Sequence, residues 1–262
     1  CSSDLFDEPF CVGVKHMNPC GSATGKTIAE AWKKAYEADK TSIFGGIVAA
    51  NREIDLETAE MLKPIFLEIV MAPSFAPDAL ELLCTKKNLR VLKVDMSKDN
   101  TVRKQYVSMN GGMLVQDRDI NTKPVAADQC VTEAKPTAEQ LADLEFAWKI
   151  VKHVKSNAIV VAKNGMTYGV GAGQMNRIGS AEIALKQAQK TLKEEGKDIM
   201  TEGLVLASDG FFPFNDCVAI AAEYGIRAIV QPGGSIRDED SIKLANEKGI
   251  TMLFTGERHF KH

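Results

Sequence analysis

Short apolar runs alternate along the 262-residue chain with stretches in which apolar residues recur every three or four positions. Runs such as 46–50 are typical of buried strands, whereas Ile28, Ala31, Trp32 and Ala35 share one face of a helix. The pattern predicts strands over 11–15, 46–50, 68–72, 89–94, 103–108, 112–116, 158–162, 166–170, 204–207, 228–230 and 250–254, and helices over 26–38, 56–62, 77–84, 181–195, 216–224 and 238–248, with a further long helix that begins at Thr137, where Gln140 completes a capping box.

The second half of the chain repeats the order of elements in the first half. Residues 158–254 match residues 11–94 in the succession of strands and helices, in their approximate lengths, and in the prolines that follow two of the strands, Pro73 and Pro232. We infer an internal duplication of one α/β unit, because the period is too long for a solenoid repeat. Strands separated by helices imply mostly parallel sheets covered on both faces, and two such units facing each other would form a cleft between their strand ends.

The composition is ordinary for a soluble globular protein, with 45% hydrophobic and 26% charged residues. A net charge of −3 argues against non-specific nucleic-acid binding and leaves room for a local basic phosphate site. No apolar window is long enough to span a bilayer, and no secretory signal opens the chain. The six cysteines are scattered without a C-x-x-C pair, which indicates reduced thiols and a cytoplasmic protein. Because residue 1 is cysteine and not methionine, we expect a fragment or a processed chain.

Lys15 and His16 stand side by side where the first predicted strand ends. Neighbouring residues on a strand face opposite sides, so their side chains converge only if the chain turns there. Pro19 and Gly21 favour such a turn. Ligands usually bind beyond the carboxyl ends of strands in α/β proteins, which makes the pair a candidate for catalysis. The alternative is a solvated lysine at a strand end beside a loop histidine whose hydrogen bonds are satisfied.

Two polar features accompany the first strands of the second half. Asn157 directly precedes a predicted strand, a position where asparagine commonly forms a cap or a turn. Residues 169–173 are rich in glycine and lead towards a helix start, with Arg177 just behind them. Backbone N–H groups in such a segment can bind an anion. The segment lacks both the Gly-Lys-Ser/Thr of a Walker loop and the third glycine of a dinucleotide fingerprint, so it indicates phosphate binding outside those two classes.

The most unusual segment is 208–216, in which three phenylalanines fall within four residues and are interrupted by a proline. These rings cannot all face one core, so we interpret them as an aromatic wall for a flat heterocycle, with a carboxylate to accept its N–H. Asp216 is the candidate carboxylate, and the alternative for it is a cap in the first turn of a helix, where a negative charge complements the dipole. The closing residues 258–262 contain an arginine and two histidines directly after a core strand, which predicts a docked segment and not a disordered tail.

Eight segments, taken in order, resemble the transformylase domain of the bifunctional purine-biosynthesis enzyme that also carries IMP cyclohydrolase. They are V-K-H-M-N-P-C-G, F-G-G-I-V-A, N-G-G-M-L-V-Q-D-R-D, K-S-N-A-I-V-V-A-K-N-G, G-V-G-A-G-Q-M-N-R, S-D-G-F-F-P-F-N-D, Q-P-G-G-S-I-R-D and R-H-F-K-H. The resemblance covers essentially the whole chain. It implies a fold of tandem duplicated cytidine-deaminase-like three-layer α/β/α units, the first over 1–120 and the second over 121–262. The implied reaction is formyl transfer from 10-formyltetrahydrofolate to the 5-amino group of AICAR ribonucleotide.

The same resemblance implies roles for individual residues. Lys15 and His16 match the family's catalytic Lys-His pair, and Asn157 matches its catalytic asparagine. An aromatic amine is a poor nucleophile, so His16 is the natural general base, while Lys15 and Asn157 are suited to stabilising the oxyanion. An alternative role for Lys15 is to protonate the departing folate nitrogen. The positions that match substrate- or folate-binding residues are Phe44, Gly45, Arg177, Ile178, Phe211, Pro213, Asp216, Arg258 and His262.

The resemblance further implies a cytoplasmic homodimer with its active site at the interface, acting on AICAR ribonucleotide and folate and on neither nucleic acid nor membrane. Arg177 and Arg258 would suit the phosphate or carboxamide region of AICAR. The family's upstream Arg-Tyr pair, which helps to hold AICAR, is not in this sequence, so we expect weak activity from this chain alone. Cys217 stands where some relatives carry asparagine and others glycine, so we expect no conserved side-chain contact at that position.

Two other functions have to be weighed. Zinc deaminases need histidine and cysteine ligands and a glutamate in H-x-E and P-C-x-x-C spacing. Here Cys20 is followed by Ala23 where the second cysteine should stand, and His16 is followed by Met17 and Asn18. We therefore predict no catalytic metal. The other alternative is a folate- or nucleotide-binding homologue without turnover, which would bind its ligands and transfer no formyl group.

Overall fold

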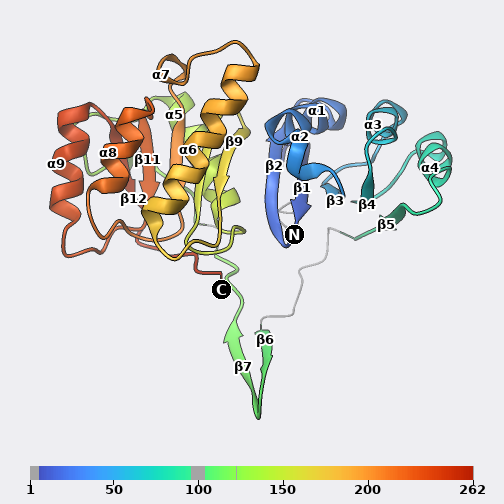
Figure 1. Cartoon of the computed structure of the whole chain (residues 1–262), viewed down its shortest axis with the longest axis horizontal. Coiled ribbons are helices and arrows are strands. Elements are labelled where there is room, and N and C mark those ends of the chain that lie inside the picture. Colours follow the sequence, from blue (N-terminus) through green and yellow to red (C-terminus); the bar gives the residue numbers. More distant parts are fainter. Residues whose placement is uncertain (1–5, 96–103, 122, 262) are drawn as a thin grey trace.

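Ten strands form one continuous sheet with helices packed against it (Figure 1). The computed structural model describes residues 6–95, 104–121 and 123–261. Across the sheet the strands run β12 (Thr251–Phe254), β11 (Ala228–Gln231), β10 (Val205–Ser208), β8 (Ile159–Lys163), β9 (Met166–Gly171), β2 (Asn18–Thr24), β1 (Phe10–Lys15), β3 (Gly46–Ala50), β4 (Leu67–Ala72) and β5 (Arg90–Lys93). The helices are α1 (Ile28–Ala38), α2 (Lys40–Ile43), α3 (Leu56–Leu62), α4 (Pro77–Cys84), the 3-10 helix η2 (Ala127–Gln129), α5 (Ala138–Val151), α6 (Arg177–Glu194), α7 (Ile199–Glu202), α8 (Asp216–Glu223) and α9 (Asp238–Lys248).

The two halves of the sheet share one topology. In each half a hairpin, β1–β2 or β8–β9, lies nearest the centre. The first strand of that hairpin pairs antiparallel with β3 or β10, and two more strands add to it in parallel. The sheet is therefore mixed. The parallel pairing predicted from strands separated by helices is found in the outer three strands of each half.

The halves join edge to edge where β2 pairs antiparallel with β9 through Ala23 and Met166. The expectation that two units face each other across their strand ends is wrong, because both belong to one sheet. Since the central pairing is antiparallel, the carboxyl ends of the outer strands point to opposite edges in the two halves. The turn between β1 and β2 consequently lies at the edge where β10, β11 and β12 end (Figure 1).

The strand β2 is not predicted by the sequence pattern, because Pro19 and Gly21 favour a turn. Both residues lie inside the strand, and the turn is formed by His16 and Met17, whose φ angles are 50° and 64°. Left-handed angles at both central positions give a two-residue hairpin the twist of the flanking strands. Pro19 lies opposite Val14 at a break in the register, which is where a strand tolerates a missing N–H.

Helix α6 begins four residues before the predicted start at 181. The Asn176 side chain caps the helix by accepting a hydrogen bond of 2.8 Å from the Gly179 N–H. Gly179 and Ser180 have low helix propensity, which conceals this start in the sequence pattern. The capping box predicted for α5 at Thr137 is confirmed. The early start of α6 places Arg177 in the first turn, within hydrogen-bond distance of the end of β10.

Two apolar cores lie on the two faces of the sheet. One is built under α1, α3, α4, α6, α8 and α9 and contains the fully buried Phe212 and the nearly buried Trp32. The other lies under α5 and contains Trp148, with Phe6 and Val125 packed around it. Among the described residues, no helix is both long and apolar enough to cross a membrane.

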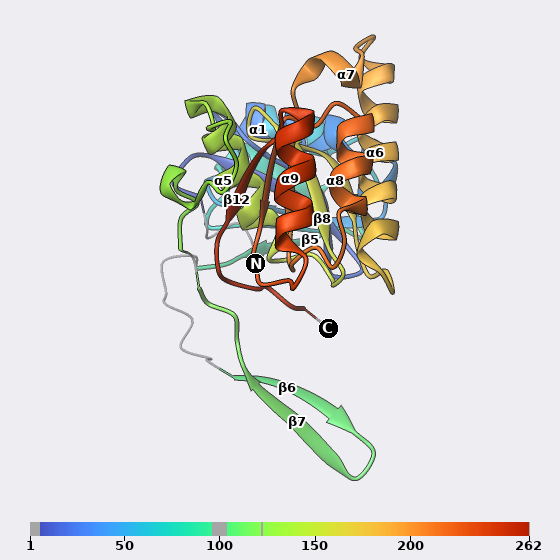
Figure 2. The same cartoon turned by 90° about the vertical axis from the view of Figure 1, so that its left-hand side faces the viewer.

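A separate two-stranded sheet projects from this body, formed by β6 (Lys104–Met109) and β7 (Gly112–Asp117). Figures 1 and 2 both show it extending away from the ten-stranded sheet. We call residues 104–117 the arm. The two strands predicted at 103–108 and 112–116 are confirmed apart from residue 103, which lies outside the described residues.

Candidate active site

Six of the predicted site residues line one pocket of about 450 Å³ in the second half, which we call the aromatic pocket. It lies at the edge of the sheet where β8 begins and β10 ends, beside the first turns of α6 and α8. This edge is where ligands bind in open α/β sheets. The lining residues are Asn157, Met175, Asn176, Arg177, Ile178, Phe211, Pro213, Phe214, Asp216 and Phe260.

The three phenylalanines between β10 and α8 do not all face the core, as the sequence predicts. Phe212 turns into the core and is fully buried, whereas Phe211 and Phe214 line the aromatic pocket. The Arg258 guanidinium lies over the rings of Phe211 and Phe260, at 5.7 and 5.9 Å from the ring centres. The closing segment is thus docked, as predicted, although His262 itself lies outside the described residues.

Asp216 combines its two proposed positions. It is the first residue of α8, and its Oδ1 accepts a hydrogen bond of 2.8 Å from the Cys217 N–H. It also lines the aromatic pocket. Because one carboxylate has two oxygens, the capping contact leaves acceptor capacity for a ligand N–H. The Cys217 side chain is buried in the core, which agrees with the expectation that it makes no site contact.

Asn157 is held in one orientation by its neighbours. Its Oδ1 accepts a hydrogen bond of 2.8 Å from Arg177 Nη2, and its Nδ2 donates one of 2.9 Å to the Gln174 carbonyl. Its own carbonyl accepts a hydrogen bond of 2.7 Å from Ser180 Oγ. A carboxamide nitrogen carries two hydrogens, so one N–H of Asn157 remains for a group in the pocket. The segment that precedes β8 therefore presents a fixed donor.

Arg177 is buried and its guanidinium is engaged inside the protein. Its Nη1 donates to the Asp209 carboxylate and, at 2.9 Å, to Ser208 Oγ. Asp209 has no exposed surface and also accepts from Ser156 Oγ and, at 3.0 Å, from the Ala158 N–H. Such a pair is stable in a low-dielectric site only when its remaining donors and acceptors are matched. Arg177 lines the aromatic pocket, and its hydrogen bond to Asn157 Oδ1 holds the Asn157 side chain in place.

Asp209 is the residue that sequence reasoning missed. The duplication contains the signal, because Asn51 follows β3 as Asp209 follows β10. Asn51 Oδ1 accepts a hydrogen bond of 2.7 Å from the Phe10 N–H, just as Asp209 accepts from Ala158. The first half has a neutral asparagine at this position, whereas the second half has a carboxylate. The carboxylate is needed there because it balances the charge of the buried Arg177.

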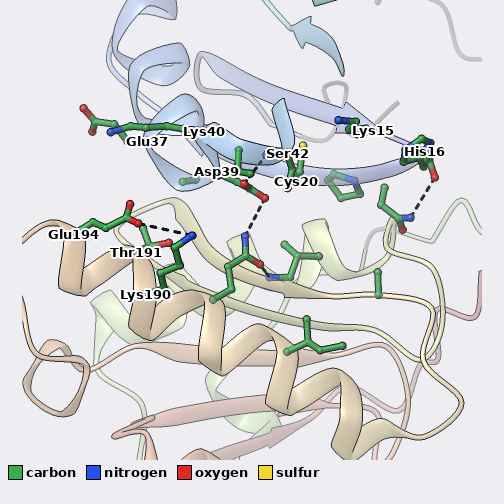
Figure 3. Close-up of a pocket in the computed structure, with 18 residues that line it drawn as sticks. Lys15, His16, Cys20, Glu37, Asp39, Lys40, Ser42, Lys190, Thr191 and Glu194 are labelled. Carbon is green, nitrogen blue, oxygen red and sulfur yellow. Dashed lines mark hydrogen bonds and ion pairs between the residues drawn. The ribbon is translucent and has the colours of Figure 1, made fainter. Parts of the chain in front are cut away.

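Lys15 and His16 line a different pocket, of about 570 Å³, at the junction of the two halves. We call it the junction pocket. Figure 3 shows Lys15 and His16 at one end of it and Lys190 and Glu194 of α6 at the other. Between them, Asp39 Oδ2 accepts a hydrogen bond of 3.0 Å from Gln187 Nε2, which links the first half to α6.

The predicted positions Phe44 and Gly45 lie next to Lys15. Lys15 Nζ donates a hydrogen bond of 2.7 Å to the Phe44 carbonyl. The Phe44 ring is 60% exposed and its centre lies 5.4 Å from that of Phe66. Gly45 has a φ of 71° and donates from its N–H to the Phe66 carbonyl at 2.8 Å. The structure therefore groups Lys15, His16, Phe44 and Gly45 at one edge of the first half.

The two groups of predicted residues are neighbours but do not share a pocket. The Asn18 side chain accepts a hydrogen bond of 2.8 Å from the Lys155 N–H, two residues before Asn157. Lys261 Nζ donates to the Met17 carbonyl at 3.3 Å and to the His153 carbonyl at 3.0 Å. These contacts fasten the turn between β1 and β2 to the edge that carries the aromatic pocket.

The chemistry of the junction pocket is not that of a thiol site. Burial and then the charge of Asp39 raise the pKa of the Cys20 thiol to about 11, so the thiol is protonated at neutral pH. Within the described ranges, no three His, Cys, Asp or Glu side chains are placed to hold a metal ion. The absence of a catalytic metal stays a prediction.

Comparison with known proteins gives one consistent result. A family model described as "AICARFT/IMPCHase bienzyme" matches residues 2–187. Three curated relatives carry the name "Bifunctional purine biosynthesis protein PurH". The protein from Anoxybacillus flavithermus is 61% identical over 257 residues, covering 98% of this chain and 48% of that protein. Those from Bacillus subtilis and Lactobacillus delbrueckii subsp. bulgaricus are 58% and 57% identical, again over 98% of this chain and over 48% and 49% of theirs.

The chain spans about half the length of the curated relatives it matches. Among solved structures, a diaminohydroxyphosphoribosylaminopyrimidine deaminase/5-amino-6-(5-phosphoribosylamino)uracil reductase from Thermotoga maritima aligns with a TM-score of 0.28 and 20% identity, over 43% of this chain and 34% of that one. A superposition this poor does not bear on the fold. The family model, in contrast, covers most of the sequence. On that match, the chain belongs to the AICARFT/IMPCHase bienzyme family.

Proposed function

We propose that this chain transfers the formyl group of 10-formyltetrahydrofolate to the 5-amino group of AICAR ribonucleotide, as one step of purine biosynthesis. Membership of the AICARFT/IMPCHase family supports the reaction class. The observation that carries the proposal is the fixed Asn157 carboxamide at the wall of the aromatic pocket, which Asp216 also lines. A donor that cannot rotate away is what stabilisation of an oxyanion requires.

The aromatic pocket suits the pterin ring of a folate. Its volume of about 450 Å³ lies within the usual range for small-molecule sites, roughly 300–1,000 Å³. Phe211, Pro213 and Ile178 supply flat and apolar contacts, and Asp216 supplies an acceptor for ring N–H groups. Arg258 lies over Phe211 at the edge of the pocket, where a cation suits an anionic substrate. The co-substrate 10-formyltetrahydrofolate is therefore part of the proposal.

The proposed chemistry uses three residues. His16 accepts the proton of the AICAR amine as that nitrogen bonds to the formyl carbon. Lys15 and the free N–H of Asn157 stabilise the oxyanion of the tetrahedral intermediate. When the intermediate collapses, the bond from the formyl carbon to the folate nitrogen breaks, and that nitrogen takes up a proton. The protonated His16 returns the proton that it took from the amine, and Lys15 is the alternative donor.

We extend the proposal to a homodimer with the active site at its interface. In a single chain, Lys15 and His16 line the junction pocket while Asn157 lines the aromatic pocket. A second copy would bring its exposed turn between β1 and β2 over the aromatic pocket, where Met175 is 92% exposed. Static light scattering at micromolar concentration measures the mass directly, and a monomer that is fully active would contradict this arrangement.

We also propose a more specific fold for the two halves and a cellular location for the protein. The matching topology of the two halves supports tandem cytidine-deaminase-like units, the first over 1–120 and the second over 121–262. The boundary falls after the arm, in residues that belong to neither half of the ten-stranded sheet. A cytoplasmic location is supported by the described cysteines, which are all free. AICAR ribonucleotide and folate are the proposed partners, with neither nucleic acid nor membrane.

A formyltransferase assay on the purified chain tests the function. We expect slow turnover, and Asn157→Ala should lower it further while leaving the fold intact. The separation of Lys15 from Asn157 in one chain favours a second candidate, a homologue that binds folate and nucleotide without turnover. Calorimetry distinguishes the two: binding of AICAR and a folate analogue with no formyl transfer, even after an upstream segment is restored, supports the second candidate. Full activity of the chain alone would contradict the expected weak turnover.

A further inference from the structure

His259 is the buried member of the closing segment, of which the structure describes residues 258–261. Its side chain is 3% exposed, whereas the flanking Arg258 and Phe260 are exposed. Burial thus alternates along the segment, as it does along an extended chain, in which successive side chains point to opposite sides. Of the described closing residues, Phe260 lines the aromatic pocket and His259 does not. The Arg258 guanidinium lies 5.7 Å from the centre of the Phe211 ring, which belongs to the wall of the same pocket.

Two neighbours hold the His259 imidazole in place. Its Nδ1 lies 2.6 Å from Asp119 Oδ2, and its ring centre lies 4.6 Å from that of Trp148. Burial raises the pKa of the Asp119 carboxyl, but the hydrogen bond and charge of His259 and the charge of Lys152 outweigh this effect and lower the pKa. An ionised carboxylate only accepts hydrogen bonds, so His259 Nδ1 is the donor. A hydrogen bond to a charged group is roughly twice as strong as one between neutral groups.

The backbone of the closing segment is hydrogen-bonded to the edge of the sheet that carries the aromatic pocket. The His259 N–H donates a hydrogen bond of 3.0 Å to the Asp209 carbonyl. Lys261 and Ser156 are joined twice, because the Ser156 N–H donates to the Lys261 carbonyl at 2.9 Å and the Lys261 N–H donates to Ser156 Oγ at 3.1 Å. The amides of residues 259 and 261 therefore report whether the segment is docked.

We propose that His259 is a positioning residue for folate binding, because its imidazole fixes the closing segment so that Arg258 and Phe260 complete the wall of the aromatic pocket. This inference rests on the proposed use of that pocket by folate. A wall residue contributes to binding only while it is in place, so the apparent affinity falls with the fraction of molecules in which the segment is docked. The alternative is a histidine that only fills space in the core around Trp148, which would affect stability and leave affinity unchanged.

The first variant is His259→Ala, which removes the hydrogen bond to Asp119 and the contact with Trp148 and keeps the backbone N–H. A hydrogen bond to a charged group is worth roughly tenfold or more in an equilibrium constant. We therefore expect the KM for 10-formyltetrahydrofolate and the Kd of a folate analogue to rise about tenfold. At saturating folate the ligand itself selects the docked segment, so kcat should change by less than about threefold.

Three further variants accompany it. Asp119→Ala removes the partner from a side chain that is 34% exposed, so it should fold even if His259→Ala does not, and it should raise KM and Kd in the same direction. Combining the two changes should add little, because both act through one contact. His259→Asn keeps a donor near the position of Nδ1 and should restore most of the affinity. The matched control is Lys123→Ala, which removes an exposed ion pair of 3.6 Å with Glu257 beside the closing segment and should leave affinity unchanged.

Hydrogen exchange gives a second readout that needs no ligand. In His259→Ala and Asp119→Ala the amides of residues 259 and 261 should exchange faster, while amides of α5 and β10 stay protected.

The proposal is overturned if KM and Kd in both variants stay within about twofold of the unchanged protein, even where the melting temperature falls. An equal loss of affinity in Lys123→Ala, no recovery in His259→Asn, or unchanged exchange at residues 259 and 261 would also overturn it. Failure of the proposed function would appear in the unchanged protein, which would then bind no folate analogue. Failure of the role assigned to His259 would appear only in the comparison between variants.

Discussion

Replacing Asp209 by asparagine should destabilise the protein more than a surface change on α6, the helix that carries its partner Arg177. Asp209 is fully buried and the Arg177 side chain facing it is only 6% exposed. Removing one charge of a buried pair leaves the other uncompensated and typically costs about 3–5 kcal/mol. Asparagine keeps an oxygen for the Ala158 N–H, so we expect a loss near the lower end, about 3 kcal/mol in the free energy of unfolding. Because single domains are stable by only about 5–15 kcal/mol, this loss is readily measured.

The assay is urea unfolding followed by far-ultraviolet circular dichroism at neutral pH. The matched control is Glu182→Gln, which removes the exposed ion pair with Lys186 on α6. An ion pair in water contributes little, so this variant should unfold at an unchanged urea concentration. If the free energy of unfolding of Asp209→Asn lies within about 1 kcal/mol of that of the unchanged protein, the buried pair does not stabilise the fold as proposed.

A double variant separates stability from orientation. Arg177→Met/Asp209→Leu replaces the buried pair by apolar side chains, a change that is often neutral for stability. It also removes the Arg177 hydrogen bond to Asn157 Oδ1. If formyl transfer depends on a fixed Asn157, kcat should fall by about 10²–10³-fold in this variant even when stability is restored. Activity that recovers together with stability would refute the positioning role.

Three further changes test other parts of the structure. Burial lowers the pKa of His153 to about 3, below its ordinary 6.5, so stability is complete above the ordinary value and falls with decreasing pH. His153→Gln should therefore remove about 1.3 kcal/mol of the stability difference between about pH 7.5 and 5.5, measured by urea unfolding at both values. Lys261→Met loses the hydrogen bonds to the Met17 and His153 carbonyls and should speed amide exchange in the turn between β1 and β2, with little change in the rest of the sheet. Gly210→Ala would place Cβ 2.5 Å from Arg177 Nη2 and should lower the melting temperature, whereas the same change at Gly112, where Cβ meets nothing within 4 Å, should not.

Most elements could be predicted because their apolar spacing agrees with their place in the sheet. Helices α3, α4 and α9 have the predicted bounds, and β3 does as well. The strand β2 was not predicted for two physical reasons. Its turn is formed by His16 and Met17 in the left-handed region, which residues of these types rarely adopt. Pro19, a residue typical of turns, lies inside the strand. The second half offered a guide, since Asn164 and Gly165 form the equivalent turn with ordinary turn residues.

The site could be predicted in its residue types and only partly in its arrangement. The wall of Phe211, Pro213 and Asp216 follows from an aromatic segment that cannot fit one core. The role of Arg177 does not follow, because its partner Asp209 is distant in sequence and no local pattern links them. The placement of Lys15 in another pocket than Asn157 depends on how the two halves join at β2 and β9, which side-chain periodicity does not encode.

The Lys15–His16 turn and the aromatic pocket are proposed to serve one reaction. A crystal structure of the protein with AICAR ribonucleotide and a folate analogue measures this most directly. We expect the folate ring between Phe211 and Asp216, the AICAR amine within hydrogen-bond distance of a His16 imidazole, and Asn157 facing the carbon to be transferred. AICAR bound far from every Lys15 and His16 in the assembly, or a folate bound outside the aromatic pocket, would contradict it.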